Sequence, residues 1–112
     1  MNDFRKLIVW QKAMDLARDL YVHTSKFPSE EKFGLTSQMR RSAVSIPSNI
    51  AEGSKRGTKK DFTQFLRIAA GSAAELETQL LLSKELFGFD NEPLLDILKE
   101  VQKMLESLIK KL

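Results

Sequence analysis

The feature that most constrains this chain is a long helical repeat in its second half. Small or apolar residues recur there at alternating steps of four and three: Phe62, Leu66, Ala69, Ala73, Leu76, Leu80, Ser83 and Phe87. This spacing places all of them on one face of a helix, as in the seam of a helical bundle. Thr58 precedes the segment as a helix cap, and Gly88 follows it as a stop. The repeat therefore predicts one helix of a bundle.

Three further segments show the same helical period. The first runs from about Ile8 to Lys26, and its expected core face is Trp10, Ala13, Met14, Ala17, Leu20, Tyr21 and Thr24. The second has the apolar stripe Leu35, Met39, Ser42, Ala43, Ile46, Ile50 and Gly53. The last starts at Asp90 or Asn91 and repeats Leu94, Leu98, Val101, Leu105, Leu108 and Leu112. Short links between these segments predict an all-α fold, an antiparallel up-down-up-down four-helix bundle that forms a single domain over residues 1–112.

The second helix contains a proline. Pro47 lacks a backbone donor and clashes with the carbonyl four residues earlier, so it predicts a kink. Asn49 and nearby serines can satisfy the freed carbonyl groups; in the alternative interpretation, Asn49 and Glu52 line a recess. Gly53 is the expected end of this helix. Its start has two solutions, a cap at Ser29 or a later start near Gly34.

Composition excludes several classes of function. The chain has no cysteine and one histidine, so it offers no disulfide, thiolate metal site or cysteine nucleophile. No histidine stands at the Glu-x-x-His spacing of di-iron bundles, so we expect no metal and no cofactor. The start lacks the apolar region of a signal peptide, and no stretch is long enough to span a membrane. We therefore expect a cytoplasmic protein that is not an enzyme.

Positive charge is concentrated around the second helix. Between Thr36 and Lys60 there are six Lys or Arg residues and one acidic residue. Arginine binds phosphate through two parallel hydrogen bonds, and lysine acts as a point charge. The candidate nucleic-acid-binding residues are Arg40, Arg41, Lys55, Arg56, Lys59, Lys60 and Arg67. For Arg40 and Arg41, pairing with acidic residues such as Glu52, Glu75 or Glu77, inside the bundle or between subunits, explains the charge equally well. For Lys55 to Lys60, contact with RNA is favoured.

A run of small residues interrupts the third helix. Ala70, Gly71 and Ala74 cover more than one face, and Gly71 weakens the helix by about 1 kcal/mol relative to alanine. We expect this stretch to lie at a subunit interface. The alternative is that a bulky side chain such as Trp10, Phe65 or Met39 fills the space.

Several blocks of sequence resemble one family. They are residues 9–13 (VWQKA), 27–28 (FP), 33–35 (FGL), 38–41 (QMRR), 45–53 (SIPSNIAEG), 70–72 (AGS) and 75–77 (ELE). Together they resemble the four-helix-bundle proteins encoded by intervening sequences of the 23S ribosomal RNA gene, a bacterial family labelled as a ribosomal protein. The resemblance extends from about Phe4 to the last helix.

The resemblance implies a ring-like homo-oligomer, a pentamer, with a positively charged surface. The accessory protein of diversity-generating retroelements is similar in build and works with nucleic acid. The family supplies no catalytic residue. The resulting hypothesis is a non-enzymatic homo-oligomer that associates with ribosomal or other structured RNA through a basic surface. The alternative is a protein-protein interaction scaffold that does not bind RNA directly.

Overall fold

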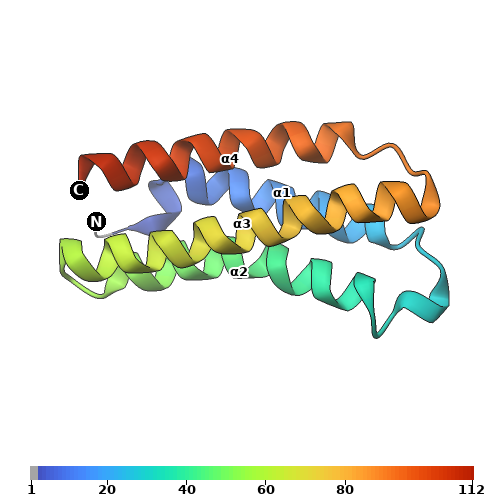
Figure 1. Cartoon of the computed structure of the whole chain (residues 1–112). Helices are drawn as coiled ribbons and strands as arrows, with labels where there is room; N and C mark the ends of the chain where they lie inside the picture. Colours follow the sequence, from blue (N-terminus) through green and yellow to red (C-terminus); the bar gives the residue numbers. More distant parts are fainter. Residues whose placement is uncertain (1–2) are drawn as a thin grey trace.

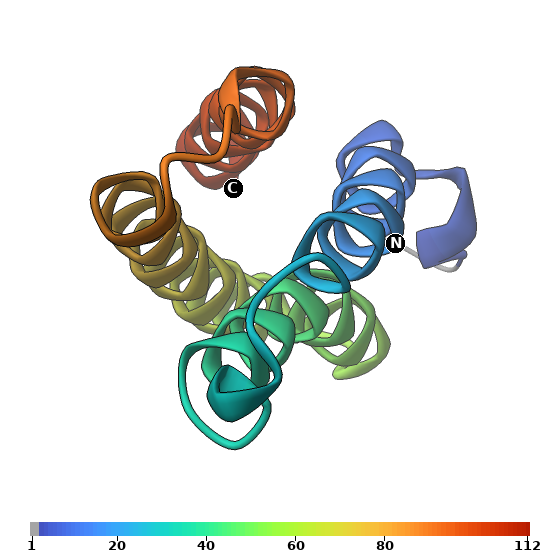
Figure 2. The same cartoon turned by 90° about the vertical axis from the view of Figure 1, so that its right-hand side faces the viewer.

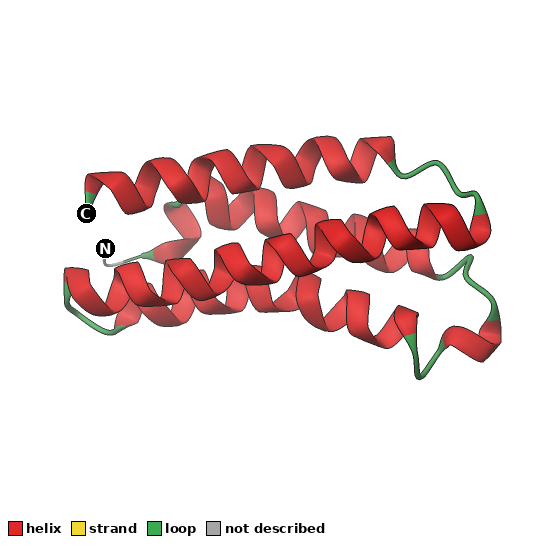
Figure 3. Ribbon diagram, in the orientation of Figure 1, coloured by secondary structure: helices red, strands yellow, loops and turns green. Residues whose placement is uncertain are grey.

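The computed structural model describes residues 3–112, and all regular secondary structure in that range is helical. Four long helices form the body: α1 (Ile8–Thr24), α2 (Leu35–Lys55), α3 (Lys59–Phe87) and α4 (Glu92–Lys111). Two short 3-10 turns, η1 (Phe4–Lys6) and η2 (Ser29–Glu31), precede α1 and α2 (Figure 3). No strand occurs in the described part of the chain. The all-α prediction of a four-helix bundle is confirmed.

The helices follow one another around the bundle. In Figure 1 each helix runs back along the one before it, so both termini lie at the end that holds the α2–α3 turn. The view along the bundle shows the four helices around a common centre (Figure 2). α1 packs on α2 and α4, and α3 packs on the same two helices. α1 and α3 are therefore diagonal neighbours.

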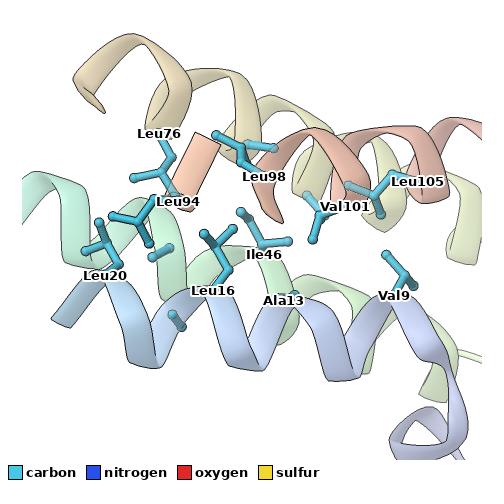
Figure 4. Close-up of a cluster of buried hydrophobic side chains, with 14 of the residues drawn as sticks. Val9, Ala13, Leu16, Leu20, Ile46, Leu76, Leu94, Leu98, Val101 and Leu105 are labelled. Carbon is cyan, nitrogen blue, oxygen red and sulfur yellow. The ribbon is translucent and has the colours of Figure 1, made fainter. Parts of the chain in front are cut away.

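The core lies along the centre of this arrangement. The expected seam of α3 is buried from Phe62 to Ser83, and Phe87 at its end is half-buried. Leu94, Leu98, Val101 and Leu105 bury the facing side of α4. In Figure 4 these side chains point toward α1, with Ile46 of α2 among them. Each buried Leu or Ile contributes about 1.5–3 kcal/mol through removal of apolar surface from water, so this layer holds the bundle together.

The expected core face of α1 is wrong in part. Val9 and Leu16 are buried, whereas Trp10 and Met14 are half-buried and Tyr21 is 44% exposed. Because α1 contacts α2 on one side and α4 on the other, the face of α1 that points into the core lies midway between them. This face carries Val9, Ala13, Leu16 and Leu20 (Figure 4). Trp10, Met14 and Tyr21 fall on the flank of α1 toward α2.

The expected signals at the ends of α3 and α4 are confirmed. Thr58 Oγ1 accepts a hydrogen bond of 3.1 Å from the backbone N–H of Asp61 and caps α3. Gly88 ends α3 in the left-handed conformation, with φ of 73°. Asn91 is the residue before α4, and Pro93 lies in its first turn.

Gly53 does not end α2, contrary to the expectation from sequence. The helix continues to Lys55, and Gly53 is buried against α3. A Cβ atom at this position would lie 2.6 Å from the Cβ of Phe65 and 3.1 Å from Cδ1 of Phe62. The glycine therefore allows close contact between two helices.

The sequence left two points about α2 open, where it starts and what Asn49 does near Pro47. The helix starts at Leu35 after Gly34, so the later of the two expected starts is correct. α2 then continues through Pro47, which is buried, and Asn49 Nδ2 donates to the Ser45 carbonyl at 2.8 Å. Because the carbonyl that Pro47 leaves without a backbone donor is that of Ala43, four residues earlier, this bond does not test the structural interpretation of Asn49, and the kink stays a prediction. Met1 and Asn2 of the N-terminal arm lie outside the described residues.

Candidate nucleic-acid interface

Four of the expected phosphate-binding residues lie together at one end of the bundle. Lys55 ends α2, Arg56 follows it as the C-cap, and Lys59 and Lys60 begin α3; all four are exposed. Gly57 makes the tight turn between the helices with φ of 92°, a conformation that favours glycine. Residues 55–60 contain no acidic side chain. We call the end of the bundle that carries this turn the basic end.

The individual contacts at the basic end leave much of its charge facing solvent. Arg56 Nη2 forms an ion pair of 2.8 Å with Glu52, and its guanidinium lies over the Phe65 ring. No hydrogen bond or ion pair occupies the ammonium groups of Lys59 and Lys60 within residues 3–112. The first backbone N–H groups of α3 also point outward here, where the helix dipole favours an anion.

The structure adds basic residues that sequence reasoning did not include. Lys110 and Lys111 finish α4 at the same end, and Arg5 and Lys6 lie in η1 near the start of α1 (Figure 1). The up-down order of the helices could have revealed them, because it brings the end of α4 beside the α2–α3 turn. The turns at the opposite end, residues 25–34 and 88–92, hold four acidic residues and two lysines. The two ends of the bundle therefore differ in charge.

Arg67 extends the basic surface along α3. It is exposed and stands seven residues after Lys60, which corresponds to about two turns or 10 Å on the same face of the helix. No ion pair engages it in the described residues. A phosphate backbone that lies on the basic end can reach Arg67 without leaving α3.

Arg40 is not part of this surface. Its Nε donates to Thr24 Oγ1 at 2.9 Å and its Nη2 donates to the Tyr21 carbonyl at 3.3 Å. The guanidinium also lies 4.5 Å from the centroid of the Tyr21 ring. Arg40 therefore joins α2 to α1, and its partners are not the acidic residues that we considered.

Arg41 points in a different direction from Arg40. It is exposed, makes no hydrogen bond or ion pair with a described residue, and stands about 21 Å along α2 from Lys55. It lines a polar cavity of about 400 Å³ between α2 and α3. The other lining residues of this polar notch are Gln38, Ser42, Ser45, Ser72, Glu75 and Gln79. The expected set thus divides into three groups: the basic end with Arg67, Arg40 bonded to α1, and Arg41 at the polar notch in the N-terminal half of α2.

Two of the three small residues expected at a subunit interface, Gly71 and Ala74, face outward from α3. Gly71 is exposed, and a Cβ atom built there would meet nothing within 4 Å. Ala74 is also exposed, whereas Ala70 is half-buried against the core. Trp10, Phe65 or Met39 does not cover Gly71, so that alternative is wrong. Ile68 and Leu82 lie on the same outward side and are 46% and 44% exposed.

A second apolar surface lies between α1 and α2. Here a groove of about 630 Å³ is lined chiefly by the side chains that fall outside the core of α1. Its apolar lining is Phe4, Trp10, Met14, Ala17, Tyr21, Val22, Val44, Pro47 and Ala51. Phe4 packs edge-on against Trp10 with ring centroids 5.3 Å apart, which fixes one end of the groove. We call it the α1–α2 groove.

Two classes of site are not formed by the described residues. No group of three or more His, Cys, Asp and Glu side chains within residues 3–112 could hold a metal ion. None of the helices in that range is both long enough and apolar enough to cross a membrane.

The fold and the basic end define a class of small helical bundles with one strongly cationic end. Residues 5–110 match the family described as 23S rRNA-intervening sequence protein, and the chain belongs to this family. A similar solved structure is that of a protein with unknown function from the S23 ribosomal protein family of Bacteroides thetaiotaomicron. The two chains are 30% identical with a TM-score of 0.81, over 92% of this chain and 96% of the other.

No curated protein matches the sequence. Neither the family nor the solved structure carries an enzymatic description.

Proposed function

We propose that this protein is a non-enzymatic homo-oligomer that associates with structured RNA, and that the basic end is its RNA-binding surface. The observation that carries the proposal is the convergence of cationic residues from separate parts of the chain. The α2–α3 turn, the end of α4 and η1 bring Lys and Arg residues to one end of the bundle. The family description mentions 23S rRNA, so a fragment of that RNA is the first ligand to test.

The chemistry of this surface favours the phosphate backbone. Lysine and arginine contacts to phosphate position a nucleic acid but carry no sequence information. Phe62 is buried and the guanidinium of Arg56 lies over the Phe65 ring, so the α2–α3 turn has no open stacking platform for single strands. We therefore expect the basic end to bind by charge and to lose affinity steeply as salt increases.

Assembly would multiply these contacts. The α1–α2 groove and the outward side of α3 are two different apolar surfaces, and α3 is diagonal to α1 across the bundle. When one surface of each copy binds the other surface of the next, the contact is head-to-tail and can close into a ring. A pentamer is the ring that the family resemblance favours. Several basic ends in one ring would bind RNA with a high effective local concentration.

The second candidate is a protein-protein interaction scaffold without direct RNA binding. The specific observation in its favour is the α1–α2 groove, because an amphipathic helix of a partner could bury its apolar face there. In that case the basic end would only stabilise the ends of α2 and α4, where lysines complement the helix dipole.

Binding to a structured 23S rRNA fragment across a salt series separates the two candidates, with the assembly mass measured in the same buffers. We expect the affinity to fall by about one log unit per log unit of salt for each phosphate neutralised. The variant with Lys55, Arg56, Lys59 and Lys60 all changed to Ala should bind more weakly and show a smaller salt slope. The matched control changes Lys26, Lys32, Lys84 and Lys99 to Ala, which removes the same charge elsewhere.

Two results would contradict the proposal. An intact oligomer that does not bind RNA at low salt would make the scaffold the leading candidate. Equal losses of affinity in the two quadruple variants would show that net charge matters and that the basic end does not.

A further inference from the structure

The polar notch is an unusual feature for the surface between two helices of a bundle. It lies between the N-terminal half of α2 and the C-terminal half of α3, two helices that are adjacent in Figures 1 and 2. Three serines line it: Ser42 and Ser45 from α2, and Ser72 from α3, whose hydroxyl bonds that of Ser45 across the two helices. Longer polar side chains complete the lining: Gln38, Arg41, Glu75 and Gln79.

The hydroxyl groups at the floor of the notch already have hydrogen-bond partners. Ser45 Oγ and Ser72 Oγ are 2.8 Å apart in a hydrogen bond, and Asn49 Nδ2 donates to Ser45 Oγ at 2.9 Å. This network joins α2 to α3 and holds the hydroxyl groups in place. A ligand would therefore meet a fixed polar floor.

The rim of the notch has unused hydrogen-bonding capacity. Gln79 Oε1 is a buried acceptor with no partner, which is costly unless a donor reaches it. Within residues 3–112, Arg41 and Glu75 form no ion pair with each other or with another residue. The notch thus presents a cation, an anion and amide groups to the same small space.

We propose that the polar notch binds one unpaired guanine nucleotide of an RNA. This inference rests on the proposed function, since it assigns a nucleotide-specific pocket to an RNA-binding protein. Unpaired bases are recognised through hydrogen bonds to their exposed edges. Guanine presents its N1–H and N2 amino group side by side, and a carboxylate such as Glu75 can accept both. Arg41 supplies the partner for a phosphate oxygen.

The other bases fit these groups less well. Uracil has no amino group, whereas cytosine and adenine offer their amino group beside a ring acceptor that would repel the Glu75 carboxylate. Gln38 and Gln79 carry amides that can both donate and accept, so they can meet the guanine O6 and a remaining N–H. The cavity of about 400 Å³ is in the size range of small-molecule sites.

The position of the notch is compatible with the basic end. Arg41 and Lys55 are about 21 Å apart along α2. A paired region on the basic end and one unpaired guanine in the notch can belong to the same RNA.

The first test uses the full-length protein labelled with ¹⁵N and titrated with the four nucleoside monophosphates. We expect guanosine monophosphate to shift the side-chain amide signals of Gln38 and Gln79, with an affinity at least fivefold above that of the other three. Glu75→Gln should remove this preference. Glu85→Gln is the matched control, because it makes the same charge change at an exposed residue of α3 that does not line the notch.

The second test compares two RNA hairpins that differ only in a single bulged guanine or uridine. We expect the guanine bulge to bind at least fivefold more tightly, and Glu75→Gln to abolish that difference without changing the salt slope. Equal binding of the two hairpins, with a normal salt slope, would contradict guanine binding in the polar notch. It would leave intact the proposal that the basic end binds RNA. Salt-independent or absent binding of both would overturn the proposed function and the notch together.

Discussion

Arg40 Nε donates a hydrogen bond of 2.9 Å to the buried Thr24 Oγ1, and this bond ties α2 to the last turn of α1. Thr24 Oγ1 in turn donates to the Leu20 carbonyl at 2.9 Å. Arg41, the next residue, is exposed on the other side of the same helix. Adjacent helical residues diverge by about 100°, so two neighbouring arginines take different roles.

Arg40→Met should therefore destabilise the protein by about 1.5–3 kcal/mol, the usual cost of losing hydrogen bonds to a charged group. Methionine keeps most of the apolar packing over Tyr21, so the loss reports the polar contacts. Arg41→Met is the control and should change the unfolding free energy by less than about 0.5 kcal/mol. Urea unfolding measures both. Equal losses in the two variants would show that the contact with Thr24 does not contribute.

Gly53→Ala and Gly71→Ala should have opposite effects on stability. The added methyl group at Gly53 would lie 2.6 Å from the Phe65 Cβ, so α2 and α3 must move apart. We expect a loss of about 1–3 kcal/mol from this overpacking. At Gly71 the methyl group meets open space within its own chain, so alanine should add about 0.5–1 kcal/mol through helix propensity. Thermal unfolding of both variants at the same concentration checks the signs, and a stable Gly53→Ala protein would contradict the close contact.

His23 lies in an aromatic cluster between the end of α1 and the α3–α4 turn. Its ring packs edge-on against Phe27 at 5.6 Å and against Phe89 at 6.0 Å, and its Nε2 is buried without a partner. Burial lowers the pKa of His23 below its usual 6.5, and the positive charge of Lys26 lowers it further, whereas Asp90 opposes this shift. Because the folded protein disfavours the protonated ring, the unfolded chain binds the proton more readily.

Stability should therefore fall as the pH decreases through 6.5 toward the lowered pKa of the folded state. Above pH 6.5 the ring is neutral in both states and contributes no pH dependence. Urea unfolding between pH 5.5 and 7.5 measures the effect with most carboxyl groups still ionised. His23→Phe keeps an aromatic ring in the cluster and should remove this component. A variant with the same pH dependence as the native protein would assign the effect to other groups.

The sequence predicted those parts of the fold that depend on helical period and end signals. The α3 seam from Phe62 to Ser83 is buried, and Thr58 and Gly88 mark the helix ends as expected. These features depend on residues close together in the chain, so local patterns determine them. The core face of α1 was less well predicted. An amphipathic helix that packs between two others carries apolar residues on its flanks as well as on the face that points into the core. Trp10 and Met14 lie on the flank of α1 toward α2 and line the α1–α2 groove.

The candidate site was likewise predicted where it depends on residues adjacent in sequence, and missed where it depends on contacts between distant parts of the chain. The charge pattern identified Lys55 to Lys60, which are adjacent in sequence and remain so in space. It did not include Lys110 and Lys111, which join the basic end only because α4 returns to it. It also grouped Arg40 with the others, because no local signal revealed that Thr24 and Tyr21 would bind its guanidinium. Gly53 was misinterpreted for a similar reason, since its contact with Phe65 is between helices.

Gly71→Leu or Ala74→Leu should break assembly before it breaks the fold. Both positions are exposed on the outward side of α3, so within one chain a leucine there meets solvent and the helix remains stable. In the proposed ring, a second copy approaches this flat surface closely, and the larger side chain would hold it away. Light scattering should show a smaller assembly, whereas circular dichroism should show unchanged helix content. Ser107→Leu, at an exposed position of α4, is the matched control. An unchanged assembly mass in both α3 variants, or a native protein that is monomeric at every concentration, would rule out this face as the contact between copies.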